Sequence, residues 1–286
     1  MKAVAIVAHL GKTEVASITR DVVNWLCERN IKVKIPEDEA LTLNRPDLGY
    51  PEEKIAEDIE LVIVLGGDGT ILRAVRLLRG SDIPILGVNL GKFGFLSEIE
   101  VKDLYPALTR IMNKDFSLQK RMMLDCEVVQ GRKSLAKHMA LNEIVVGRGV
   151  RQRLLEFDVY INDEFFGRYA SDGLIFATPT GSTAYSLSVG GPLVSPDTRL
   201  ILMTPVCPHS LFNRTVILND TDEIKVCSKS EQLRVTVSAD GMIIFEGKPF
   251  DFVRVSTSAS SISLVKLNGR NFYTLLKEKL AIWESF

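Results

Sequence analysis

The 286-residue sequence predicts an α/β amino-terminal domain followed by a mainly-β domain. Up to about residue 120, short apolar runs alternate with segments of helical periodicity, which is typical of a parallel, Rossmann-like sheet covered by helices. From about Met122, apolar and polar residues alternate singly between turn signals, which indicates β-hairpins. An amphipathic stretch at 272–283 predicts a final helix that packs back on the first domain. We therefore expect three parts: residues 1–120, 121–265 and 266–286.

The first part contains four apolar runs that we expect to form buried strands, at residues 3–8, 31–35, 61–65 and 83–88. Between the first two, apolar residues at spacings near 3.6 predict one face of a helix that ends near Asn30, where a left-handed stop is expected. Cys27 falls on or beside this face, so we expect it in the core. Residues 36–51 are polar and turn-rich, so we expect a mobile loop there. Apolar residues after position 70 predict a second helix.

The second part carries two clear hairpin signals. Residues 156–161 alternate between apolar and polar and are followed by Asn162-Asp163. Residues 233–237 alternate in the same way before Asp240-Gly241. Asx-Gly and Asn-Asp pairs tolerate the left-handed backbone that tight hairpin turns require, so both are expected to be antiparallel strand pairs.

The composition limits the classes of function. Lys and Arg number 35 against 36 Asp and Glu, for a net charge of -1, so there is no global attraction to nucleic acid or an anionic membrane. The four cysteines are scattered singly and the three histidines lie far apart, which argues against disulfides and a metal site made by the protein alone. No apolar run reaches the roughly 18–20 residues that span a bilayer, and no signal peptide is recognisable. We expect a cytoplasmic protein.

One glycine-rich segment follows a predicted buried strand and opens a predicted helix. It consists of Gly66, Gly67, Asp68, Gly69 and Thr70. Glycines let a ligand approach the backbone, and the amides of a helix start bind phosphate. A carboxylate at that place repels phosphate unless it holds a metal or takes a proton, which indicates phosphoryl transfer. The alternative is a tight turn with Asp68 as helix N-cap.

A second segment, residues 178–188 (T-P-T-G-S-T-A-Y-S-L-S), is dense in hydroxyls. It follows an apolar run and precedes a short predicted helix, so it could line a nucleoside pocket or form a capped Ser/Thr-rich turn.

Two common nucleotide-binding motifs are absent from the sequence. Gly11-Lys12-Thr13 lacks the glycine that a P-loop requires at position 6, which is Ile6, and no G-x-G-x-x-G follows either of the first two strands.

These two segments together resemble the NAD kinase family, whose superfamily includes phosphofructokinases and diacylglycerol kinases. The resemblance covers most of the chain, which looks like a bacterial member of the family. It also includes Asn89 to Leu96 (N-x-G-x-x-G-F-L), Asn142-Glu143, and Pro208 to Leu211. The G-G-D-G-T segment is shared across the superfamily, whereas T-P-T-G-S-T-A-Y-S-L-S is specific to NAD kinases.

The resemblance implies transfer of the γ-phosphoryl of ATP to the 2′-hydroxyl of the adenosine ribose of NAD, giving NADP. It assigns Asp68 as proton acceptor and also as an NAD contact. It assigns ATP phosphate binding to Gly66, Gly67, Gly69 and Thr70. It assigns NAD binding to Gly69, Asn142, Glu143, Arg153, Asp172, Thr183, Ala184, Tyr185, Ser186, Leu187 and Ser188. It further implies Mg²⁺ or Mn²⁺ arriving with ATP, and a homodimer or homotetramer.

Two positions depart from the family pattern. Relatives often carry glutamine after the Asp240-Gly241 pair, where this chain has Met242, so a side-chain contact with the ligand at 242 stays open. Ala170 stands where relatives often carry a larger polar or basic side chain, so a preference between NAD and NADH is not implied. Two other functions remain open at this point. A diacylglycerol- or sphingoid-type lipid kinase shares the glycine-rich loop, and a non-catalytic dinucleotide sensor would keep the pocket, although binding alone would not need Asp68.

Overall fold

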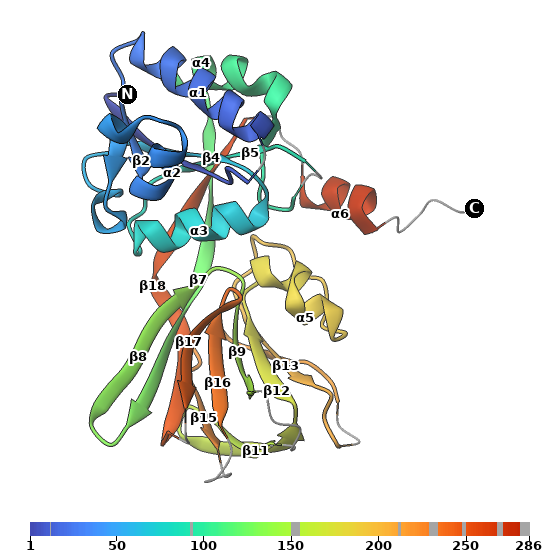
Figure 1. The fold of residues 1–286 in the computed structure, drawn as a ribbon. Coiled ribbons are helices and arrows are strands. Elements are labelled where there is room, and N and C mark those ends of the chain that lie inside the picture. Colours follow the sequence, from blue (N-terminus) through green and yellow to red (C-terminus); the bar gives the residue numbers. More distant parts are fainter. Residues whose placement is uncertain are drawn as a thin grey trace. The chain divides into compact units, whose positions relative to one another are not determined.

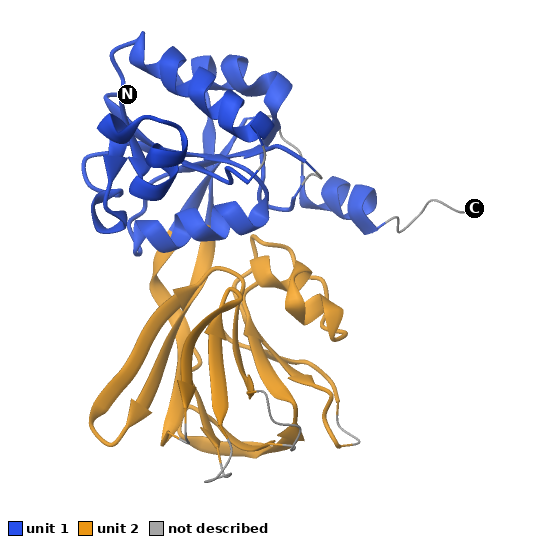
Figure 2. Cartoon of the chain, in the orientation of Figure 1, with its two compact units in different colours: residues 1–120, 262–286 blue, residues 121–261 orange. Residues whose placement is uncertain are grey.

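The structure is a computed structural model that describes residues 1–11, 13–91, 94–149, 155–210, 213–228, 234–247, 250–267 and 271–280. It contains two compact units, Met1–Lys120 with Ile262–Phe286 (unit 1) and Arg121–Ser261 (unit 2), which Figure 2 shows in different colours. Two long strands, β7 (Ser117–Gln130) and β18 (Phe252–Lys266), continue from one unit into the other. The three-part domain division expected from the sequence stays a prediction, because compactness does not establish which parts fold alone.

Unit 1 is built on a parallel sheet with the strand order β5-β4-β1-β2-β3. The strands are β1 (Ala3–Ala8), β2 (Lys32–Pro36), β3 (Gly49–Tyr50), β4 (Leu61–Leu65) and β5 (Ile85–Asn89), and β6 (Ile99–Glu100) also pairs with β5. The end of β18 joins the sheet where Leu264 pairs with Ile85. The central strands are buried on both faces, which explains their continuous apolar sequences. This confirms the expected α/β fold.

Helices cover both faces of this sheet (Figure 1). The helices are α1 (Thr13–Cys27), α2 (Glu37–Thr42), α3 (Asp68–Leu78), α4 (Leu104–Met112) and α6 (Phe272–Leu280), with single 3₁₀ turns at Pro46–Leu48, Glu52–Lys54 and Val101–Asp103. Val22 and Leu26 of α1 and Leu108 of α4 share one hydrophobic core with the sheet, and α3 lies on the opposite face (Figure 1). Asn30 has a φ of 57°, as expected for a left-handed residue after α1.

Two expectations in unit 1 were wrong. Residues 36–51 are not an irregular loop, because they contain α2, a 3₁₀ turn and β3. The buried carboxylate of Glu39 in α2 accepts a hydrogen bond from the Ala8 N–H (2.7 Å) and pairs with Arg73 of α3, which fixes the segment to β1. A six-residue helix is too short for its periodicity to be recognised in sequence. Cys27, expected in the core, is exposed.

The expected return of the carboxyl-terminal helix to the first domain is confirmed by α6. The Phe272 ring at its start lies 6.5 Å from the Phe95 ring, and the Lys279 ammonium lies 5.1 Å from the same ring. Leu275 and Leu276 on this helix are buried. The α6 helix is therefore part of unit 1.

Unit 2 consists of antiparallel strands, as the alternating sequence predicts. One sheet has the order β14-β13-β12-β9-β16-β17, and the other places β11, β10, β15 and β18 side by side, with β7 pairing β18 and β8. The strands are β8 (Lys133–Ala140), β9 (Glu143–Arg148), β10 (Leu155–Ile161), β11 (Glu164–Ser171), β12 (Gly173–Ala177), β13 (Ile201–Val206), β14 (Val216–Leu218), β15 (Ile224–Ser228), β16 (Val235–Ala239) and β17 (Met242–Gly247).

The two sheets of unit 2 share one hydrophobic core. Phe157 of β10 and Phe176 of β12 are its largest fully buried side chains. Both expected hairpin turns are present: the φ angles are 52° and 67° at Asn162 and Asp163, and 46° and 77° at Asp240 and Gly241. Two consecutive positive φ angles are the mark of a type I′ turn. A 3₁₀ turn (Thr180–Thr183) and the short helix α5 (Tyr185–Ser188) follow β12.

Candidate active site

Asp68 is the first residue of α3, directly after the carboxyl end of β4. Its carboxylate accepts hydrogen bonds from two backbone amides of another loop, Phe95 N–H to Oδ2 (2.8 Å) and Leu96 N–H to Oδ1 (3.1 Å). The N-cap of α3 is Gly67, so the N-cap role considered for Asp68 is wrong. The two amides hold the carboxylate in one orientation while each oxygen keeps a lone pair for a further donor.

The glycines around Asp68 have two different environments. A Cβ on Gly66 would lie 2.3 Å from Oγ1 of Thr70, so the Thr70 side chain fills the space over Gly66. Among the described residues, a Cβ on Gly67 or Gly69 would meet nothing within 4 Å, and both glycines are exposed. Because the first-turn amides of a helix have no intrahelical acceptor, the open side at Gly67 and Gly69 suits an anionic group.

The loop that holds Asp68 is fixed by contacts on its other side. Glu98 is buried, its N–H donates to the carbonyl of Gly87 (2.9 Å), and its carboxylate pairs with Lys266 and accepts from the Leu267 N–H (2.8 Å). Both partners lie at the end of β18 or just after it. Since Phe95 also contacts α6, the carboxyl-terminal segment supports the loop that orients Asp68.

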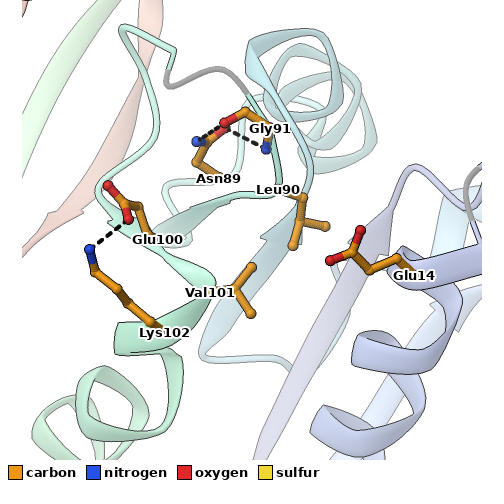
Figure 3. A pocket seen from close by; sticks show the side chains of 7 residues that line it. All are labelled: Glu14, Asn89, Leu90, Gly91, Glu100, Val101 and Lys102. Atoms are coloured by element: carbon orange, nitrogen blue, oxygen red, sulfur yellow. Dashed lines mark hydrogen bonds and ion pairs between the residues drawn. The ribbon is translucent and has the colours of Figure 1, made fainter.

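A cleft of about 510 Å³ opens at the carboxyl end of β5 (Figure 3). Glu14 and Glu100 both line it, and Lys102 pairs with Glu100 at 2.8 Å. The Asn89 side chain bonds the backbone of Gly91 through both its amide nitrogen (2.7 Å) and its oxygen (3.3 Å). Asn89 therefore shapes its own turn, and two carboxylates make this cleft unfavourable for a polyphosphate.

In unit 2, Asn142 and Glu143 form the junction between β8 and β9. The Glu143 side chain is 7% exposed, and its Oε2 has no hydrogen-bond partner among the residues that the structure describes. Burial, and next the neighbouring carboxylate of Asp240, raise the pKa of Glu143 to about 7, against a smaller lowering by the Tyr185 N–H. A buried acceptor without a donor is suited to a hydroxyl-bearing ligand.

The hydroxyl-rich segment packs against this junction. A Cβ on Gly181 would lie 2.1 Å from the Asn142 carbonyl oxygen, so only glycine allows this approach. The Thr178 hydroxyl donates to the Leu141 carbonyl (2.6 Å). Ser186 is buried, with its hydroxyl 3.2 Å from that of Thr204, so its side chain contacts protein. Thr183, Ala184 and Leu187 are half-buried, and Tyr185 and Ser188 are exposed.

The other expected contacts are placed as follows. Asp172 pairs with Arg148, the carboxylate and guanidinium lying 2.9 Å apart. Arg153 lies outside the described residues. Met242 is 37% exposed at the start of β17.

Within the described residues, no group of three His, Cys, Asp or Glu could hold a metal ion. No helix among them is long and apolar enough to span a membrane.

Sequence reasoning missed the role of Asp240. Its carboxylate accepts hydrogen bonds from the N–H groups of Leu141, Asn142 and Glu143, at 2.8, 2.7 and 3.1 Å. The only signal in the sequence was the Asp-Gly turn, which gives no indication of contacts with residues 97–99 positions away.

Comparison with known proteins gives a consistent result along the chain. Two family models match, "ATP-NAD kinase N-terminal domain" at residues 4–116 and "ATP-NAD kinase C-terminal domain" at residues 141–267. The NAD kinase of Moorella thermoacetica is 41% identical over 280 residues, covering 98% of this chain and 89% of the relative. The NAD kinase of Desulforamulus reducens is 36% identical over 285 residues, covering 100% and 99%.

Solved structures agree with this assignment. Yeast NADH kinase, determined in complex with NADH, superposes with a TM-score of 0.92 at 30% identity, covering 100% of this chain and 89% of the yeast chain. An NAD kinase from Archaeoglobus fulgidus in complex with ATP has the same fold, with a TM-score of 0.76, 22% identity, and coverage of 97% and 98%. The chain belongs to the ATP-NAD kinase family.

Proposed function

We propose that this protein transfers the γ-phosphoryl group of ATP to the 2′-hydroxyl of the adenosine ribose of NAD, giving NADP. The observation that carries the proposal is the Asp68 carboxylate, held by the Phe95 and Leu96 amides beside the open backbone of Gly67 and Gly69. The names of the full-length relatives support NAD as the acceptor. Family membership leaves no observation in favour of a lipid kinase.

In this proposal Asp68 accepts the proton of the ribose 2′-hydroxyl as that oxygen attacks the γ-phosphorus. A ribose hydroxyl is a weak nucleophile at neutral pH, and a positioned base contributes roughly 10²–10⁴-fold to the rate. The open amides at Gly67 and Gly69 bind ATP phosphate oxygens. Gly66 and Thr70 are the other proposed ATP phosphate contacts, and the Thr70 side chain also packs over Gly66.

The proposed dinucleotide contacts lie in unit 2. Glu143 accepts hydrogen bonds from ribose hydroxyls, which would satisfy its buried Oε2. Asn142 orients the dinucleotide through its amide, and Asp172 accepts from the adenine amino group. The remaining proposed NAD contacts are Gly69, Arg153, Thr183, Ala184, Tyr185, Leu187 and Ser188, with Ser186 contributing through packing.

Two further parts of the proposal, the metal ion and the oligomeric state, rest on family resemblance. A divalent cation, Mg²⁺ or Mn²⁺, would be bound mainly by the phosphate oxygens of ATP. In such sites Mg²⁺ keeps several water ligands and takes only one or two protein carboxylates. When bound, it neutralises charge on the transferring phosphates. We also propose a homodimer or homotetramer located in the cytoplasm.

The proposal is tested by incubating the purified protein with NAD, ATP and Mg²⁺ and detecting NADP with a dehydrogenase that reduces only the phosphorylated dinucleotide. We expect NADP only when all three components are present. A folded protein that forms no NADP would contradict the proposal, and NAD affinity measured by calorimetry would then distinguish a dinucleotide sensor from a protein with another ligand.

A further inference from the structure

The segment 141–143 is held from two sides. On its carbonyl side, the Thr178 hydroxyl donates to the Leu141 carbonyl (2.6 Å) and the Thr178 N–H donates to the Asn142 carbonyl (2.9 Å). On its amide side, three successive N–H groups, of Leu141, Asn142 and Glu143, donate to the carboxylate of Asp240. Hydrogen bonds to an ionised carboxylate are shorter and about twice as strong as neutral ones, so Asp240 supplies the stronger side.

The hairpin turn that carries Asp240 also contacts this segment through its backbone. Asp240 and Gly241 connect β16 to β17, and the Asp240 N–H donates to the Glu143 carbonyl (3.0 Å), so the turn also pairs directly with the start of β9. The turn at Asn162-Asp163 has the same signs of φ, and its first residue, Asn162, corresponds to Asp240. The Asn162 Oδ1 accepts a hydrogen bond from one backbone amide, the Glu223 N–H (3.0 Å). The Asp240 carboxylate differs in accepting three successive amides and in carrying a charge.

We propose that Asp240 is a positioning residue for dinucleotide binding: its carboxylate holds the backbone of residues 141–143 and thereby sets the directions of the Asn142 and Glu143 side chains. The inference rests on the proposed function for the identity of the ligand. Asp240 acts through the backbone of its neighbours, and Glu143 and Asn142 make the contacts. Because the backbone is already fixed, NAD binding costs less conformational entropy. The loss of Asp240 should therefore weaken NAD affinity.

The test compares Asp240→Asn with Asp163→Asn, the same change in the other type I′ turn, where the carboxylate pairs with Lys225 at the surface and not with backbone amides. An asparagine retains one acceptor oxygen, which can keep the amides of Asn142 and Glu143, but it places an NH₂ group against the Leu141 N–H. We expect the Kd and KM for NAD to rise about 10-fold or more, which corresponds to the loss of one charge-assisted hydrogen bond. The kcat at saturating NAD and the KM for ATP should change less than about 3-fold, and Asp163→Asn should match wild type.

The pH dependence of NAD affinity is a second measurement. It should change if Asp240 acts on Glu143, and it should stay the same if Asp240 only stabilises the fold. Among the described residues, the groups that face the Glu143 carboxylate are the carboxylate of Asp240 and the backbone N–H of Tyr185. Removing the Asp240 charge should lower the pKa of Glu143, so the pH at which NAD affinity changes should become lower. A folded Asp240→Asn protein with wild-type NAD affinity and an unchanged pH profile would overturn the proposal.

Amide hydrogen exchange on the wild-type protein provides a test that does not require a folded variant or kinase activity. We expect the amides of Leu141, Asn142 and Glu143 to be protected without ligand, at the level of neighbouring strand amides of β9. Exchange at the rate of an open loop would overturn the inference. A wild-type protein that makes no NADP would contradict the proposed function alone, because amide protection would still decide whether Asp240 holds this backbone.

Discussion

The carboxylate of Asp68 lies directly against the backbone of Gly94, so closely that a Cβ on Gly94 would be 1.7 Å from Asp68 Oδ1. Asp68 begins α3, which follows β4, and Gly94 lies in the loop that follows β5. Only a residue without a side chain lets the Phe95 and Leu96 amides reach the carboxylate. The position of the proposed base therefore depends on a glycine 26 residues away.

Replacing Gly94 by alanine should displace Asp68 from its amide donors. We expect kcat for NADP formation to fall roughly 10²-fold or more, the loss associated with a misplaced general base. Steady-state kinetics on purified Gly94→Ala measure this. Gly91→Ala is the matched control, because a Cβ there would meet nothing within 4 Å. Equal activities for the two variants would mean that the Asp68–Gly94 contact does not orient the base.

The ion pair between Glu39 and Arg73 joins α2 and α3 to the end of β1. The Glu39 side chain is 6% exposed and burial raises its pKa, whereas Arg73 is 31% exposed. Arg73→Met would leave a buried carboxylate without its cation, and we expect the free energy of unfolding to fall by about 2–4 kcal/mol. Urea unfolding checks this value.

The control for that change is Arg79→Met. The Arg79 guanidinium pairs with Glu53 at 3.4 Å, but both side chains are at least 60% exposed, so we expect a loss of no more than about 1 kcal/mol. Similar losses for the two variants would show that burial of Glu39 does not govern the strength of its pairing.

Glu143 should make stability depend on pH. Its pKa in the folded protein, about 7, lies above the ordinary value of 4.5 because of burial and the Asp240 charge. Folding therefore favours the protonated carboxyl. Its contribution to the free energy of unfolding is fully present below about pH 4.5 and is lost as pH rises through about 7. A rise in pKa from 4.5 to about 7 corresponds to about 3 kcal/mol.

Glu143→Gln removes this titration. We expect the variant to be more stable than wild type at pH 8, by up to about 3 kcal/mol, and to lose that advantage at pH 5, while binding NAD more weakly at both pH values. Urea unfolding at the two pH values measures the difference. An advantage of the same size at pH 5 and pH 8 would contradict a raised pKa.

The sequence predicted the elements whose signals are local. Leu61–Leu65 is a run of apolar residues that reads as a buried strand, and Asn162-Asp163 is a turn that two adjacent residues determine. The helix α2 was missed because its buried members, Glu39 and Ala40, are too few to show a period and one of them is charged. Its stability comes from β1 and α3, which are distant in sequence.

The candidate site was predicted by residue type, but its internal geometry was not. Asp68 and the T-P-T-G-S-T-A-Y-S-L-S segment are recognisable in the sequence itself. The contacts that orient them join Asp68 to Phe95 and Asp240 to Asn142, which are 27 and 98 residues apart. No pattern within one segment carries that information, so these pairings required the structure.

The central claim, that Asp68 accepts the proton of the ribose hydroxyl, is tested most directly by Asp68→Asn. Asparagine nearly preserves the shape of the side chain and removes its ability to take a proton, while its one remaining oxygen keeps either the Phe95 or the Leu96 N–H as a donor. Calorimetry with NAD and the coupled NADP assay should give an NAD affinity close to wild type and a kcat lowered at least about 10²-fold. Near-normal turnover by the folded variant would contradict the account and remove Asp68 from the role of base.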